Sequence, residues 1–196
     1  MRTNAHSQIV RRRQGVAILA GIVCLSLLIG LHNGSVAGAS APLPMCQHLS
    51  VARGPQISPA TQELAVAVTL TNRGSQSCEL TGYPSLILRS ATQGVLGFVF
   101  QHEPTSDFDI TTAPPHRVVL TPRGHAFFLV AKLVCETGEG ARATSMLVSP
   151  PGTSQSLRLA LDYPRINFCS GGSAAIENRV SVTPVEPSVD SLWLRS

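Results

Sequence analysis

The stretch VTLTNRGSQSCELTGYPSL, residues 68–86, decides the fold of this chain. Its first residues alternate apolar and polar side chains, which is typical of a half-buried strand. Residues 72–74 (Asn-Arg-Gly) then form a turn, because Asn and Gly tolerate positive φ angles. Cys78 follows, and a second turn at residues 82–84 (Gly-Tyr-Pro) leads into a second strand. The stretch therefore predicts two strands joined through turns, with a cysteine between them.

The segment before this domain carries an export signal. Residues 15–31 form an uncharged apolar run that is slightly long for a signal-peptide core and short for a membrane-spanning helix. Basic residues before it and small residues at 37–41 predict a hydrophobic helix that is either a cleaved signal, the favoured alternative, or a retained anchor. We therefore expect residues 1–41 to be a signal peptide or N-terminal membrane anchor. The protein would be extracytoplasmic, either secreted or anchored in the plasma membrane, and only residues 15–31 would contact the membrane.

The charge distribution argues against nucleic-acid binding. The net charge is +4, and four arginines of the N-terminal segment account for all of it: Arg2, Arg11, Arg12 and Arg13. Nucleic-acid binding needs a basic face that releases counterions from phosphates. No such excess remains in the exported part, so we expect no nucleic-acid partner.

Four cysteines of the exported part predict two disulfide bonds: Cys46, Cys78, Cys135 and Cys169. Four cysteines allow three connectivities, and the sequence leaves them open. We favour Cys46 with Cys78 and Cys135 with Cys169, which would close loops of about 32 and 34 residues. No Cys-x-x-Cys spacing occurs, which argues against a zinc ribbon or a thioredoxin-type redox pair.

Short strands separated by Gly and Pro turns continue along the chain. We expect strands at residues 63–71, 85–89, 95–100, 118–120, 126–134, 145–148, 156–161 and 179–183. Residues 126–134 are apolar on both faces, which indicates a central strand covered on both sides. Residues 101–116 read as a long loop with at most one short strand near 108–110. The pattern predicts an all-β, antiparallel β-sandwich of about seven to nine strands over residues 42–186, followed by a flexible tail at 187–196.

The order of motifs in the exported part resembles a known family. Leu-Thr-Asn-x-Gly at 70–74 precedes Cys-x-Leu-x-Gly-Tyr-Pro at 78–84, and further landmarks follow: Leu-x-Pro-x-Gly-x-Ala at 120–126, Pro-Pro-Gly at 150–152 and Val-x-Pro at 182–184. With the four cysteines, these motifs resemble exported actinobacterial proteins catalogued as domain of unknown function 4232. The resemblance spans about residues 46–184 and implies an immunoglobulin-like sandwich. It implies no established activity and no catalytic residues. Arg123 and His125 depart from the small residues often found in that turn.

Catalytic motifs find little support. The sequence has no Gly-x-Ser-x-Gly element, and Ser85 after Tyr83-Pro84 is an ordinary strand or turn serine. Asp107 and Asp109 would share one side of an extended loop, but we favour an ordinary solvated loop as the explanation for them. We therefore expect no enzyme activity and no cofactor.

Metal binding is the alternative function that the residues leave open. Met45, Cys46 and His48 cluster at the entrance of the domain, and sulfur with imidazole suits copper or zinc. Three further histidines lie in loops or at strand ends: His102, His116 and His125. A metal site would require at least three of these side chains to meet. The first hypothesis remains a noncatalytic binding or interaction module of the cell envelope, with a protein, glycan or lipid partner.

Overall fold

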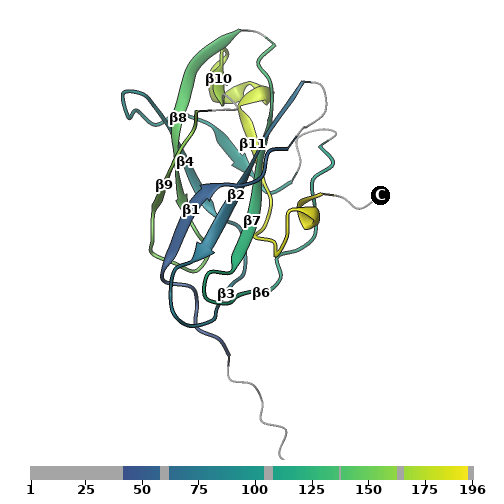
Figure 1. The fold of residues 1–196 in the computed structure, drawn as a ribbon. Coiled ribbons are helices and arrows are strands. Elements are labelled where there is room, and N and C mark those ends of the chain that lie inside the picture. The colour runs from purple at the N-terminus through teal and green to yellow at the C-terminus, as the bar shows by residue number, and fades with distance from the viewer. Residues whose placement is uncertain (1–41, 58–61, 104–107, 137, 163–165, 194–196) are drawn as a thin grey trace, which may run out of the picture. The chain divides into compact units, whose positions relative to one another are not determined.

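Two β-sheets contain most of the regular structure in the computed structural model (Figure 1). The structure describes residues 42–57, 62–103, 108–136, 138–162 and 166–193. The five-stranded sheet contains, in spatial order, β1 (Leu49–Arg53), β2 (Glu63–Asn72), β7 (His125–Leu133), β11 (Arg179–Val182) and β5 (Val99–Gln101). The four-stranded sheet contains β10 (Asn167–Cys169), β8 (Glu139–Ser149), β4 (Ser85–Ser90) and β9 (Leu157–Ala160), with β9 paired to β8. A separate pair joins β3 (Cys78–Leu80) to β6 (Val118–Leu120).

Helices are short in the part of the chain that the structure describes. They are the 3₁₀ turns η1 (Gly172–Ala174), η2 (Ile176–Asn178) and η3 (Asp190–Leu192). The all-β class is therefore confirmed. The predicted hydrophobic helix lies in residues 1–41, outside the described residues. Among the helices that are described, none is long and apolar enough to cross a membrane.

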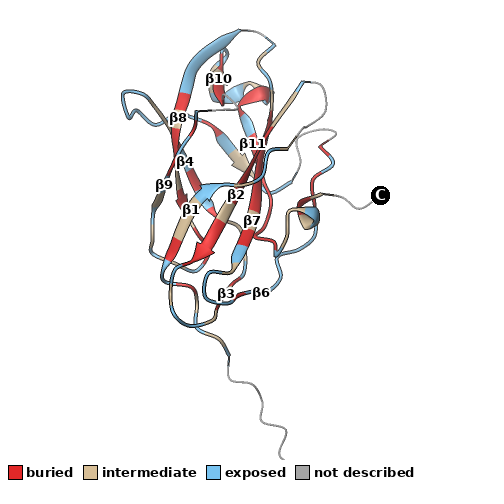
Figure 2. Cartoon of the chain, viewed as in Figure 1, coloured by how far each residue is buried: buried red, intermediate tan, exposed pale blue. Residues whose placement is uncertain are grey.

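The two sheets share one hydrophobic core, because alternate strand residues point toward it. On β2 the inward residues are Val66, Val68 and Leu70, and on β7 Phe128 lies fully buried beside them. The opposite sheet contributes residues such as Leu88, Met146, Val148 and Leu159. Figure 2 shows β7 and much of β2 in the colour of buried residues. The period-two pattern of residues 63–71 thus marks a core strand, as predicted.

One strand pairing departs from the expected antiparallel order. β5 pairs with β11 in parallel, with Val99 opposite Arg179 and Phe100 opposite Val180. The other pairings between the described strands are antiparallel. A parallel pair needs a long connection, and here most of the second sheet lies in the chain between the two strands.

Residues 187–193, part of the predicted flexible tail at residues 187–196, pack against the five-stranded sheet. A second hydrophobic cluster covers the outer face of the five-stranded sheet, and Leu192 lies fully buried in it with Phe108, Ile110 and Leu129. The C-terminal segment therefore packs on β2 and β7, and Figure 1 shows η3 beside β7. Residues 194–196 lie outside the described residues. This covering explains why β7 is apolar on both faces.

The strands outnumber the expected seven to nine because three short ones carry weak patterns. β1, β3 and β10 were not predicted, and β8 begins six residues earlier than the predicted strand at 145–148. The first residues of β8 are exposed and contain Gly140 and Ala141, so they lack an apolar alternation. They are held by backbone pairing to β10 instead.

Candidate functional site

A groove of about 410 Å³ lies between the segment that precedes β6 and the C-terminal segment. It is lined by Thr111, Thr112, Ala113, His116, Glu186, Ser191 and Trp193. The two segments are joined by a hydrogen bond from the Thr111 amide to the Leu192 carbonyl oxygen (2.8 Å) and by an isolated bridge between Ile110 and Trp193. The groove is therefore built by backbone pairing between segments far apart in the sequence.

Backbone hydrogen bonds place Glu186 in this groove. Its amide donates to the Phe127 carbonyl oxygen (2.7 Å), and its carbonyl oxygen accepts from the Phe127 amide (2.8 Å). The preceding residue, Val185, donates to the carbonyl oxygen of Gly82 (3.0 Å). Gly82 has a φ of +121°, which side chains strongly disfavour. The Gly-Tyr-Pro corner thus holds Val185, the residue before Glu186, through a backbone hydrogen bond.

The carboxylate of Glu186 is buried without full compensation. Its side chain is 3% exposed, and among the described residues Oε1 has no hydrogen-bond partner. His116 Nε2 lies 3.7 Å from Oε2, and its ring is 48% exposed. Burial raises the pKa of Glu186 above its ordinary value, while His116 and the Ser191 hydroxyl oppose the shift. The groove therefore holds a carboxylate whose charged form is poorly stabilised by the protein.

The three loop histidines contact different partners. His102 stacks on Tyr83 with ring centroids 3.8 Å apart, His116 faces Glu186, and Nδ1 of His125 lies 3.0 Å from Thr71 Oγ1. Across the described ranges, no three His, Cys, Asp or Glu side chains gather as metal ligands. The metal hypothesis thus gains no support from the arrangement of these side chains.

The other candidates at the domain entrance and in the loops are dispersed. Met45 lies against the turn at Gly152, while His48 is exposed. Ser85 begins β4 opposite Ser149 and is exposed, which is a strand position. Asp109 is exposed, and Asp107 lies outside the described residues. None of these side chains lines the groove.

The predicted disulfide bonds are present. Cys46 is joined to Cys78 and Cys135 to Cys169, which is the favoured pairing. The first bond connects the entrance of the domain to β3, and the second connects the end of β7 to β10. Two disulfides are typical of proteins in an oxidising, extracytoplasmic environment.

Sequence reasoning found only one of the groove's ionisable side chains, His116. Glu186 is a single acid between Val185 and Pro187, with no pattern around it. Trp193, the only tryptophan of the chain, did offer a signal. A large aromatic residue next to Leu192 indicates burial more than it indicates a loose tail.

Residues 47–186 match the family described as Domain of unknown function (DUF4232). The chain belongs to this family. The DUF4232 match confirms the resemblance found in the sequence, and it includes His116 and Glu186 but ends before Ser191 and Trp193. No curated protein and no solved structure matches the chain significantly.

Proposed function

We propose that this protein is a noncatalytic, extracytoplasmic binding module that receives a cationic side chain of a protein partner in the groove at Glu186. The observation that carries the proposal is the buried carboxylate with an oxygen lacking a hydrogen-bond partner among the described residues. Such a group costs stability in the unbound protein. Ionisable side chains with shifted pKa values in a groove are candidates for functional sites.

The chemistry of the groove suits an alkylammonium group. An ammonium supplies three hydrogen-bond donors and a positive charge that balances the Glu186 carboxylate. The Trp193 ring provides an aromatic surface for cation–π contact and for the aliphatic stem of a lysine. Hydroxyl groups of Thr111, Thr112 and Ser191 provide further acceptors along the lining. A lysine side chain presented by a partner protein fits this combination.

The fold supports a binding role of this kind. We infer that the two facing sheets form an immunoglobulin-like sandwich, because they share one core and most strand pairings within each sheet are antiparallel. Rigid sheets hold loops in fixed positions, and loops carry binding residues in many β-sandwich proteins. The two disulfides support the extracytoplasmic location.

Titration with N-acetyl-lysine methylamide tests the proposal, with the fluorescence of Trp193 as the readout. We expect saturable binding with a Kd of about 1 mM, because one side chain makes few contacts. Glu186→Gln should weaken binding at least about tenfold, since the charge partner is removed. Binding should also weaken as the pH falls through the raised pKa of Glu186, because protonation neutralises the carboxylate.

Two controls make this titration specific. N-acetyl-norleucine methylamide has the same aliphatic stem without the ammonium, and we expect it not to bind. Glu136→Gln removes one exposed acid next to the Cys135–Cys169 disulfide and should leave the Kd unchanged. Equal responses to the two probes, or an unchanged Kd in Glu186→Gln, would show that Glu186 does not recognise a cation.

A further inference from the structure

Lys132 is the only lysine in the sequence, and its side chain is almost fully buried, with 2% exposure. It belongs to β7, where the neighbouring inward residue Val130 lies in the core between the sheets. The remaining basic residues are arginines. A buried ammonium is costly unless it has a partner or a task, and a methionine would fill similar space without that cost. We therefore looked for a chemical role of the Lys132 amino group.

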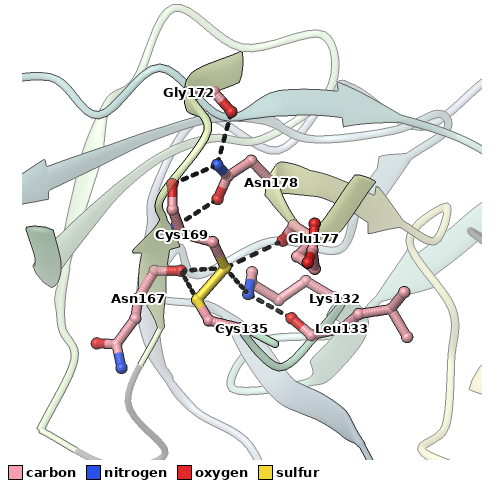
Figure 3. Close-up of a disulfide and its surroundings, with 8 residues drawn as sticks. All are labelled: Lys132, Leu133, Cys135, Asn167, Cys169, Gly172, Glu177 and Asn178. Atoms are coloured by element: carbon pink, nitrogen blue, oxygen red, sulfur yellow. Dashed lines mark hydrogen bonds between the residues drawn. A yellow bond between two sulfur atoms is a disulfide. The ribbon is translucent and has the colours of Figure 1, made fainter. Parts of the chain in front are cut away.

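The amino group of Lys132 lies beside the second disulfide (Figure 3). Nζ is 3.6 Å from Cys169 Sγ and donates a hydrogen bond to the Leu133 carbonyl oxygen. Burial lowers the pKa of Lys132 to about 8, although the nearby carboxylates of Glu177 and Glu139 act in the opposite direction. This value is close to the ordinary pKa of a cysteine thiol, about 8.5. An amine at this distance can therefore give its proton to a sulfur that leaves as a thiolate.

The two disulfides differ in exposure. Cys46 is fully buried and Cys78 is 6% exposed, so both half-cystines of the first disulfide are shielded from an attacking thiolate. In the second disulfide Cys169 is 1% exposed, whereas Cys135 is partly exposed in the loop after β7. Cys135 is therefore the one half-cystine of the four that is not buried, so a reagent from solution meets it first and Cys169 is the leaving group.

We propose that Cys135–Cys169 is a thiol–disulfide exchange site for an exported dithiol, with Lys132 stabilising the departing sulfur of Cys169. A thiolate of the dithiol attacks Cys135 Sγ, which forms a mixed disulfide and breaks the Cys135–Cys169 bond. The electron pair of that bond goes to Cys169, which leaves as a thiolate beside the Lys132 ammonium and accepts its proton. The second thiol of the dithiol, as its thiolate, then attacks the dithiol sulfur of the mixed disulfide, which closes the oxidised dithiol and releases Cys135 as a thiolate that takes up a proton from water. Two electrons pass to the protein, which ends with two thiols.

Asn178 keeps Cys169 in place through this exchange. Its Oδ1 accepts from the Cys169 amide (2.6 Å), and its Nδ2 donates to the carbonyl oxygens of Cys169 (2.9 Å) and Gly172 (2.8 Å). These bonds join Asn178 to backbone atoms of Cys169 and Gly172 and not to the sulfur, as Figure 3 shows. The reduced Cys169 therefore stays near Lys132 and is ready to be reoxidised. The inference is independent of the binding groove and does not rest on the proposed function.

The test uses the oxidised full-length chain and dithiothreitol as the dithiol. Samples are alkylated at intervals at neutral pH, and mass spectrometry measures the alkylation of each cysteine. We expect Cys135 and Cys169 to react at least about tenfold faster than Cys46 and Cys78, because Cys135 is the most exposed of the four cysteines. The rate should rise in proportion to the dithiothreitol concentration.

Variants separate the role of Lys132 from simple exposure. Lys132→Met should slow reduction of Cys135–Cys169 about tenfold below pH 8 and less above it, where the wild-type amine is itself deprotonated. Arg179→Met removes an exposed cation of β11 and should leave the rate unchanged. Equal rates for the two disulfides, a rate independent of dithiothreitol, or an unchanged rate and pH profile in Lys132→Met would each overturn the inference.

Discussion

Replacing Leu192 by alanine is expected to lower the free energy of unfolding by about 2–5 kcal/mol. Leu192 is fully buried in the cluster that covers the outer face of the five-stranded sheet, and its carbonyl oxygen accepts the Thr111 amide. Truncation would leave a cavity above Leu129 and Ala131, and it would loosen one wall of the groove. Urea denaturation of the wild type and of Leu192→Ala measures the difference.

Ile176→Ala is the matched control, because Ile176 is a large aliphatic residue that is 50% exposed. We expect a change within about 0.5 kcal/mol for this surface substitution. A loss for Leu192→Ala no larger than that of Ile176→Ala would mean that the C-terminal segment does not hold the outer face of the sheet.

Replacing Asn72 by alanine should cost about 2–4 kcal/mol, because one buried side chain connects two turns. Nδ2 of Asn72 donates to the carbonyl oxygens of Gln76 (2.8 Å), Leu120 (3.2 Å) and Thr121 (3.2 Å). Its Oδ1 accepts from the Gly74 amide (2.8 Å). The alanine variant removes all four of these hydrogen bonds inside the fold, although the Thr121 carbonyl oxygen keeps the bond from the Gly124 amide (2.8 Å). Thermal and urea denaturation both measure the loss.

Asn72→Asp sharpens this prediction. It keeps the acceptor for Gly74 but turns a carboxylate oxygen toward the three carbonyl oxygens, so it should destabilise at least as much as alanine. Thr81→Ala, an exposed residue of the same region, serves as the neutral control. An Asn72→Asp variant as stable as the wild type would show that the hydrogen bonds of Asn72 do not stabilise the fold.

Strands with strong local patterns were predictable from the sequence. The side chains of residues 63–71 alternate in size and polarity, and this segment forms β2. Residues 118–120 are all apolar and form β6. Residues 126–134 are apolar on both faces and become β7, whose two faces meet different clusters. In each case the segment alone predicts the strand, because the order of its apolar and polar residues indicates which faces of the strand are buried.

Elements held by distant partners were not predictable in the same way. β10 has only three residues and exists through its pairing with β8. The groove depends on the bridge between Phe127 and Glu186 and on the bridge between Ile110 and Trp193, which join segments far apart in the chain. His116 was identified as a candidate ligand, but its neighbour Glu186 follows only from that tertiary pairing. The residues next to Glu186 in the sequence do not indicate this pairing.

Unfolding free energies of the wild type and Glu186→Gln test whether Glu186 serves binding at the expense of stability. A carboxyl whose pKa is raised in the folded state contributes stability below its unfolded pKa and loses it as the pH rises through the folded value. We therefore expect Glu186→Gln to be more stable than the wild type at neutral pH, with the difference closing as the pH falls toward 4.5. A variant that is less stable than the wild type at neutral pH would contradict the account, because Glu186 would then be a residue that the fold needs.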